Sequence, residues 1–337
     1  MPITTMPDSI DPALQELRAR TPDQSCDGSV EGDSPTTMLS KNHWSEEYGR
    51  RYSVLGRYES VFPNDEDADH HSQCLELLLR KVLRKQLFRC PVSLDGANVC
   101  DMGTGNGQWA LNVGRADSSC RVTGVDIAPV EPSRNRTNVK FEVQDLESDW
   151  PRRSPYSFIF ARQLGGSIVD WPRLIRQCYD NLENGGWIEF HELDSNFYAQ
   201  PNSIPGHKVM EMRKLLARGL SNLGRRLDVA DYIRELLQQQ GFEHITHERI
   251  AVPLGMWPAR QDYSYSLYSQ RNIGLARITE LEFGIEGLTL KPFCKGLGWT
   301  PAEVGPFIAD VTREVVLGGT QMASNLNIIY AQKNVWY

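Results

Sequence analysis

The chain has 337 residues, of which 40% are hydrophobic and 23% are charged, and these fractions are ordinary for a globular enzyme. Its formal net charge of −7 and the lack of a Lys/Arg run argue against nucleic-acid binding, and no apolar stretch approaches the roughly 18 to 20 residues that would span a bilayer. The seven cysteines are scattered without a CxxC pair, which predicts reduced thiols in the cytoplasm and neither disulfides nor a metal site.

Residues 1–42 are rich in Ser, Thr, Pro, Asp and Gly and contain few large apolar side chains. Such a segment buries too little surface to offset its ordering entropy, so we expect a mostly disordered N-terminal extension. Within it, a short helix around Ile10–Arg20 would be able to dock on the folded part. Residues 43–94 carry a leucine-rich stripe with helical spacing near Leu75–Leu83, and we expect a helical cap over a ligand site.

Residues 95–337 are expected to form one α/β domain, because strand-like and helix-like segments alternate from residue 97 to residue 193. The helix expected over 170–186 has Asp170 as N-cap, Pro172 in its first turn and Gly185 as its stop. This alternation predicts a parallel sheet with helices on both faces and a ligand site beyond the carboxyl ends of the strands. The expected strands are 97–103, 121–127, 139–145, 156–162 and 186–193.

The C-terminal part is less regular. We expect helices over 204–223 and 228–240, a strand near 242–252 and a final strand at 324–334. The segments at about 195–225 and 258–320 are therefore predicted to be helical lid insertions.

The stretch "CDMGTGNGQ", residues 100–108, places Gly103, Gly105 and Gly107 directly behind a predicted strand. Glycines at such a turn let backbone N–H groups approach a ligand closely. A phosphate-binding P-loop would need Lys and Ser/Thr after its last glycine, and the G-x-G-x-G spacing departs from the dinucleotide pattern G-x-G-x-x-G. An adenosine-bearing cofactor such as S-adenosylmethionine fits better, although the glycines alone do not decide.

Acidic residues accompany three successive predicted strands. Asp101 precedes the glycines and suits an acceptor near the amino-acid end of the cofactor. Asp126 ends the second strand, where it would accept the ribose hydroxyls, and Asp145 ends the third, where it would meet the adenine amino group beside Leu146. An aspartate at a strand end is also common as a turn former, so the interpretation depends on the three aspartates together and not on any one of them. This layout is that of a class I methyltransferase with a Rossmann-like, seven-stranded sheet.

Several motifs together resemble the fungal LaeA-like methyltransferases. They include "VCDMGTGNGQWALNVG", "VTGVDIAPVEP", "NVKFEVQDLESDW" and "GSIVDWPRLIRQCY" with "NGGWIEF", and they cover roughly Glu46–Glu192. Met102 and Asn106 replace the Leu and the last Thr of the family's "DLGTGTG". The resemblance implies S-adenosylmethionine as cofactor and a role in secondary metabolism. It also implies cofactor contacts from the residues of the matching motifs, which add Thr104, Asn106 and Ile127.

The segment "YGRRY" resembles an N-terminal motif of the same family. Tyr48, Arg51 and Tyr52 would close over the cofactor, with the arginine facing its carboxylate. The alternative is a surface helix with solvated arginines. Arg162, which ends the fourth predicted strand, is expected to line the site next to the transferable methyl group.

His191 and Glu192 end the fifth predicted strand and are the candidate catalytic residues. The histidine would take a proton from a hydroxyl or thiol as the methyl group moves. Many methyl transfers need only proximity and alignment, so a purely structural His191 stays open.

The expected function is methylation of a small natural product, most often on oxygen. One alternative is a LaeA-like regulator of secondary metabolism, which would act in the nucleus through protein partners. Another is a cofactor-binding cyclase without methyl transfer. A homodimer is compatible with each of these functions.

Overall fold

The computed structural model describes residues 11–19, 44–56, 58–129, 136–151, 153–200, 203, 206–257, 265–317 and 321–334. The described part of the N-terminal extension is Asp11 and the helix α1 (Pro12–Ala19). The rest of the segment that was expected to be disordered lies outside the described residues. Within the described ranges, no helix has the length and apolar character needed to cross a membrane.

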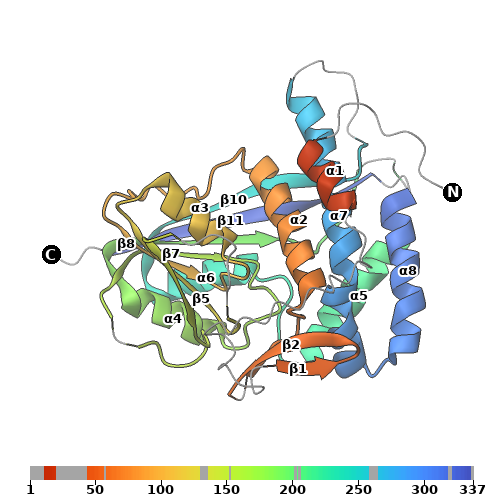
Figure 1. Ribbon diagram of the computed structural model, residues 1–337, viewed down its shortest axis with the longest axis horizontal. Coiled ribbons are helices and arrows are strands. Elements are labelled where there is room, and N and C mark those ends of the chain that lie inside the picture. The colour runs from red at the N-terminus through yellow and green to blue at the C-terminus, as the bar shows by residue number, and fades with distance from the viewer. Residues whose placement is uncertain are drawn as a thin grey trace, which may run out of the picture.

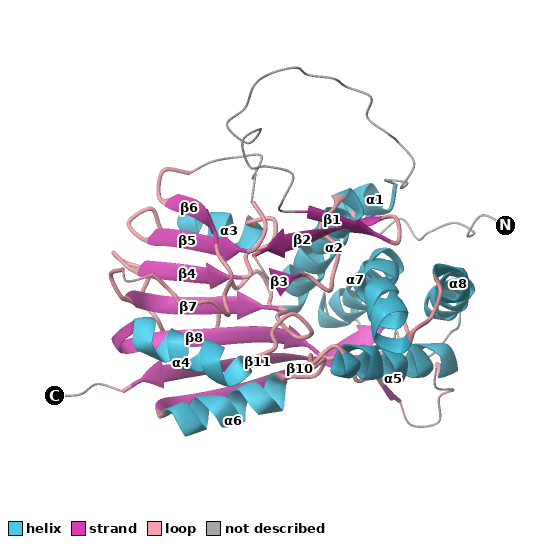
Figure 2. Cartoon of the chain, turned by 90° about the horizontal axis from the view of Figure 1, so that it is seen from below, coloured by secondary structure: helices cyan, strands magenta, loops and turns pink. Residues whose placement is uncertain are grey.

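A central sheet of seven strands organises the molecule (Figures 1 and 2). Its order is β10-β11-β8-β7-β4-β5-β6, and the short β9 (Tyr198–Ala199) pairs with β11. The strands from β8 to β6 run parallel, whereas β11 is antiparallel to both β8 and β10. This confirms the predicted class I methyltransferase sheet. The strands are β4 (Asn98–Met102), β5 (Arg121–Asp126), β6 (Val139–Val143), β7 (Tyr156–Arg162), β8 (Leu182–Leu193), β10 (Phe242–Leu254) and β11 (Met322–Lys333).

Helices cover both faces of the sheet, as predicted. On one face lie α4 (Trp171–Asn181) and α6 (Ala230–Gln240), whose buried side chains share a core with the inner strands (Figure 2). On the other face α3 (Gln108–Ala116) stacks Trp109 on Phe160 of β7, with ring centroids 3.7 Å apart. Beside α3, α2 (Glu66–Val82) packs against α7 (Tyr265–Lys291).

The helix α4 begins as predicted but ends earlier. Asp170 caps it by accepting the Arg173 N–H at 3.0 Å. Its stop is not Gly185, because β8 has already begun at Leu182 and Gly185 lies inside that strand with φ at 79°. The Lys333 ammonium donates to the carbonyls of Tyr179 and Leu182, at 2.7 and 2.8 Å, and so completes this end of the helix.

The cap over the carboxyl edge of the sheet is not purely helical, which corrects the prediction for residues 43–94. Its first part is an antiparallel sheet of β1 (Trp44–Glu47), β2 (Arg50–Leu55) and β3 (Tyr58–Glu59). Tyr48 and Gly49 form the two-residue turn with φ at 56° and 77°, the pattern that a hairpin favours. "YGRRY" is therefore a hairpin and not a surface helix.

Four helices lie beyond the carboxyl end of the sheet and have a hydrophobic core of their own (Figure 1). They are α5 (His207–Asn222), α7, the π-helix η2 (Pro292–Leu297) and α8 (Pro301–Leu317). We call this group the helical subdomain. The predicted insertions at about 195–225 and 258–320 contain these helices, and their function as a lid stays a prediction.

The N-terminal helix α1 docks on this assembly. Leu14 is buried in a core shared with α2 and α7, Asp11 pairs with Lys81 of α2, and Arg18 pairs with Glu282 of α7 at 2.9 Å.

Six cysteines fall within the described residues, and all are free and buried. They are Cys74, Cys90, Cys100, Cys120, Cys178 and Cys294.

Candidate functional site

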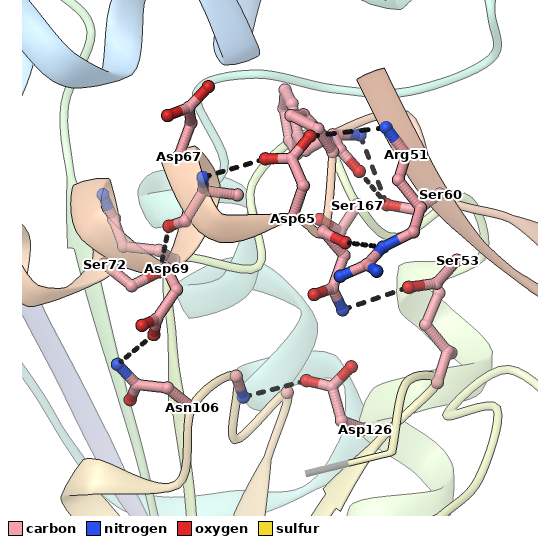
Figure 3. Close-up of a pocket in the computed structure, with 18 of the residues that line it drawn as sticks. Arg51, Ser53, Ser60, Asp65, Asp67, Asp69, Ser72, Asn106, Asp126 and Ser167 are labelled. Carbon is pink, nitrogen blue, oxygen red and sulfur yellow. Dashed lines mark hydrogen bonds between the residues drawn. The ribbon is translucent and has the colours of Figure 1, made fainter. Parts of the chain in front are cut away.

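A cavity of about 1060 Å³ lies at the carboxyl ends of the central strands, between the sheet, the cap and α7 (Figure 3). The sheet contributes the glycine loop and the ends of β5 and β7. The cap contributes the segment from Tyr58 to Gln73, and α7 contributes Glu282, Phe283 and Glu286. Of the predicted site residues, those that line the cavity are Arg51, Gly103, Gly105, Asn106, Asp126, Ile127, Asp145, Leu146 and Arg162.

The glycine loop adopts a conformation that only glycine takes readily. Gly103, Gly105 and Gly107 have φ values of 65°, 57° and 76°. A Cβ on Gly105 would meet no protein atom within 4 Å, yet the residue lines the cavity. A side chain there would therefore project into the ligand space, and the loop forms an open cradle for a ligand.

Asp126 has spare capacity for hydrogen bonds to a ligand. It accepts the Gly105 N–H at 2.9 Å and the Ala128 N–H at 3.1 Å. A carboxylate offers about four acceptor positions, so Asp126 keeps acceptor capacity for a ligand hydroxyl such as those of a ribose. Burial raises the pKa of this carboxyl, against the lowering effect of the backbone hydrogen bonds.

Asp145 and Leu146 lie at the end of β6, on the same wall of the cavity. Asp145 accepts the Glu147 N–H and the Ser148 hydroxyl, both at 2.8 Å, which fixes the orientation of its carboxylate. Leu146 is buried and offers an apolar surface of the kind a flat ring packs on.

Two acidic residues of α2 contact residues of the cavity wall, one at Asn106 in the glycine loop and one at Arg162. Asp69 accepts the side-chain amide of Asn106 at 3.2 Å (Figure 3), and Glu76 pairs with the Arg162 guanidinium at 2.5 Å. Neither residue was predicted from the sequence. Their spacing of seven places them on one face of a helix, and this signal could have paired them with the glycine motif.

The "YGRRY" segment contributes its arginines and not its tyrosines. Arg51 and Arg50, of which only Arg51 was predicted, both line the cavity. Arg51 donates to the Asn64 carbonyl at 2.9 Å, and Arg50 binds Asp65 through two hydrogen bonds of 2.6 and 2.7 Å. Tyr48 is exposed at the hairpin turn. Tyr52 is fully buried beneath Lys291, whose ammonium lies 4.0 Å from its ring centre. Neither tyrosine belongs to the described cavity wall.

Asp101 near the end of β4 and two residues of the loop, Thr104 and Gly107, are buried and do not belong to the described cavity wall. Asp101 is buried and accepts the Thr104 hydroxyl at 2.6 Å. Burial raises its pKa to about 7. The expectation that it meets the cofactor directly is therefore corrected: it supports the turn from below.

His191 does not reach the cavity, which corrects its expected catalytic position. It is fully buried, its Nε2 pairs with Glu189 Oε1 at 2.6 Å, and its ring packs edge-on against Phe160. Burial lowers its pKa.

Glu192 is likewise buried, and its carboxylate accepts the N–H groups of Leu164 and Gly165 at 2.9 and 3.2 Å. Burial raises its pKa to about 7. The two residues share a strand end but point to opposite faces of the sheet.

The strand order, the glycine loop after β4 and the acidic residues at the ends of β5 and β6 define a class I methyltransferase, an enzyme whose cofactor is S-adenosylmethionine. A family model described as "Methyltransferase domain" matches residues 70–247, and the chain belongs to this family. The predicted enzyme class and cofactor are thereby confirmed.

Similar curated proteins come from fungi. Methyltransferase pytC of Aspergillus terreus is 36% identical over 310 residues, covering 90% of this chain and 93% of pytC. The secondary metabolism regulator laeA of Aspergillus fumigatus is 27% identical over 294 residues, covering 86% of this chain and 76% of laeA. The resemblance to LaeA-like proteins is confirmed.

Among solved structures, phosphoethanolamine N-methyltransferase 2 of Haemonchus contortus, bound to S-adenosylhomocysteine, is 16% identical with a TM-score of 0.43. The match covers 78% of this chain and about half of that enzyme, 52%.

Proposed function

We propose that this methyltransferase transfers the methyl group of S-adenosylmethionine to an oxygen of a small secondary metabolite. The size of the cavity carries the proposal. A pocket for one drug-sized ligand has about 300 to 1,000 Å³, and this cavity of about 1060 Å³ extends from the glycine loop to α7. In this proposal the cofactor on the loop and a small acceptor molecule share this volume.

The residues present fit the cofactor. In this proposal the backbone carbonyls of Gly103 and Gly105 accept from the ammonium of its amino-acid end, with Arg51 as the cation for its carboxylate. Asp126 accepts the ribose hydroxyls. Three further residues would hold the adenine ring. Asp145 would accept from its exocyclic amino group, and Ile127 and Leu146 would pack against its faces.

When bound, S-adenosylmethionine supplies a methyl group activated on a sulfonium. The chain contributes alignment and exclusion of water. Tyr58 and Phe62 of the cap and Phe283 of α7 form the wall opposite the glycine loop, where an acceptor hydroxyl would lie. The proton of the acceptor hydroxyl passes to bulk water, and we assign no general base to this step, since His191 is directed away from the cavity.

The test uses the purified full chain, labelled S-adenosylmethionine and metabolites of its own gene neighbourhood. We expect label on an oxygen of one metabolite, together with S-adenosylhomocysteine. Conversion of a metabolite without label would identify a cyclase instead. No conversion of any metabolite, with label on protein, would contradict the proposal.

A second candidate is a regulator that methylates protein. The observation that favours it is the similarity to relatives named as regulators, among them the protein-methionine methyltransferase laeA of Emericella nidulans, 26% identical over 298 residues. It predicts a nuclear location and a stable protein partner, whereas the metabolic enzyme is expected in the cytoplasm.

A further inference from the structure

The turn that follows β7, residues 163–167, forms one wall of the cavity. Gln163, Leu164 and Ser167 all line it. Gln163 has φ at 52°, a left-handed conformation that side chains other than glycine adopt at a cost. A turn held in this conformation needs support from its surroundings.

That support comes from β8. The Gln163 N–H donates to the His191 carbonyl at 2.9 Å, and the Leu193 N–H donates to the Gln163 side-chain oxygen at 2.6 Å. Next, the Glu192 carboxylate accepts the N–H groups of Leu164 and Gly165, at 2.9 and 3.2 Å. These two bonds tie the backbone of the turn to β8.

The turn at residues 163–167 also contacts the glycine loop. A Cβ placed on Gly103 would come within 2.5 Å of Leu164 Cδ2, so Leu164 packs directly on the first glycine of the loop. Leu164 is buried, and the Gly103 N–H is fixed to the Val125 carbonyl at 2.8 Å. A shift of Leu164 would therefore change the space in which Gly103 holds its left-handed turn.

We propose that Glu192 is a positioning residue for cofactor binding, which holds Leu164 against Gly103 and so keeps the glycine loop in its binding conformation. This inference rests on the proposed cofactor site at that loop. It replaces the direct catalytic role expected of Glu192, because the carboxylate acts through the backbone of its neighbour and does not reach the ligand space.

A carboxylate that only braces the fold would behave differently, and β8 carries a matched example. Glu189 is also fully buried, and it accepts the N–H groups of Arg89 and Cys90, at 2.8 and 2.7 Å. It points to the opposite face of the sheet. Glu189 also pairs with His191, and neither Glu189 nor any of these three partners belongs to the described cavity wall.

The experiment compares Glu192→Gln with Glu189→Gln in the full chain. Each change replaces a carboxylate oxygen by an amide N–H₂ that faces a backbone donor, so both should lower the unfolding temperature without ligand. Isothermal titration with S-adenosylmethionine should separate them: we expect about tenfold weaker binding for Glu192→Gln and a change within about twofold for Glu189→Gln. Equal affinities in the two folded variants would overturn the proposal.

A second variant tests the proposal if Glu192→Gln does not fold. Leu164→Ala removes the contact with Gly103, and we expect a similar loss of affinity from it alone. In the double variant the losses should not add, since both act through the same contact. Unchanged affinity in Leu164→Ala would overturn the proposal as well.

Gly105→Val tests the underlying site separately. A branched side chain there would fill the ligand space and should abolish binding. Retained binding in Gly105→Val would refute the cofactor site, whereas its loss combined with a normal Glu192→Gln would refute the positioning inference alone.

Discussion

Single carboxylates have distinct roles in this molecule, although all of them lie at strand ends. Asp126 and Asp145 face the cavity, Asp101 supports the glycine loop from below, and Glu192 holds the turn beside it. The sequence predicts that such residues gather at one edge of the sheet. It cannot tell which of them face ligand and which face backbone, since this depends on loops that return from distant parts of the chain.

Asp126→Ala should weaken S-adenosylmethionine binding by roughly 1.5 to 3 kcal/mol, because the ribose hydroxyls would lose a charged acceptor. Isothermal titration measures this. Asp117→Ala is the matched control, since Asp117 likewise accepts a backbone N–H two residues on, from Ser119 at 2.8 Å, but lies outside the cavity. Equal affinity in both variants would remove Asp126 from the cofactor site, and tight NAD binding would favour a dehydrogenase.

His191→Ala should reduce turnover by less than about tenfold, because a buried imidazole paired with Glu189 cannot reach an acceptor hydroxyl. We expect its main effect on the unfolding temperature, since the change opens a cavity against Phe160. The pH–rate profile should keep its shape. A drop of about 10²-fold or more together with loss of an acid limb would restore the general-base role.

Asp101 should make the ligand-free protein less stable as pH rises. Its native pKa of about 7 lies above the unfolded value of about 3.9, so the native state holds an extra proton between these pH values. The free energy of unfolding then falls with rising pH by up to about 1.4 kcal/mol per unit. Asp101→Asn should flatten this slope in denaturant unfolding, whereas Asp95→Asn, at an exposed residue before the same strand, should leave it unchanged. Identical slopes in wild type and Asp101→Asn would contradict the assignment.

Among the elements, those defined by local signals could be predicted and those defined by distant contacts could not. The helix α3 occupies the predicted residues 108–116, and Gly241 ends α6 in a left-handed conformation. The C-terminus of α4 was misplaced because Lys333, more than 150 residues away, satisfies its last carbonyls. The cap sheet was missed because its strands are short and one face packs on helices from the other end of the chain.

The cap is joined to the helical subdomain through the two-residue strand β3. Glu59 pairs with Lys291 and Lys295, both at 2.9 Å, and Arg225 donates to its carbonyl at 3.2 Å. Burial alone would raise the pKa of Glu59, but hydrogen bonds from the two lysines lower it to about 2. The stabilisation from these ion pairs is present above the unfolded glutamate pKa of about 4.3 and is lost as pH falls toward 2.

Glu59→Gln should therefore weaken the attachment of the cap to the helical subdomain without unfolding the central sheet. We expect hydrogen exchange in β1 to β3 to accelerate by about tenfold at neutral pH, as local opening becomes easier. Glu46→Gln, at an exposed residue of the same small sheet, is the control and should exchange like the wild type. Unchanged exchange in Glu59→Gln would show that the Glu59 ion pairs do not hold the cap.

At the scale of the whole molecule, the cavity is formed by parts that are far apart in the sequence: the glycine loop, the cap and α7. The fold class could be predicted because strand patterns and the motif are local. The wall opposite the glycine loop could not, since Phe62, Phe283 and Glu286 become neighbours only after the chain has folded.

Cofactor binding should for this reason stabilise the molecule as one unit. At a concentration of about 100 times its dissociation constant, S-adenosylmethionine should add about 2.7 kcal/mol to the free energy of unfolding. Differential scanning calorimetry should show a single transition at higher temperature, and Gly105→Val should show no shift. A transition that splits in two would indicate that the ligand contacts only the sheet.

The six buried thiols give the protein a built-in set of reporters. Cys178 lies on the buried face of α4, Cys294 in the helical subdomain and Cys120 on the opposite face of the sheet. Burial raises the pKa of each of these thiols, so alkylation requires local opening of the surrounding structure. The rates at which a small alkylating reagent modifies each cysteine, read by mass spectrometry, therefore rank the three regions by how often each opens, and no label has to be engineered.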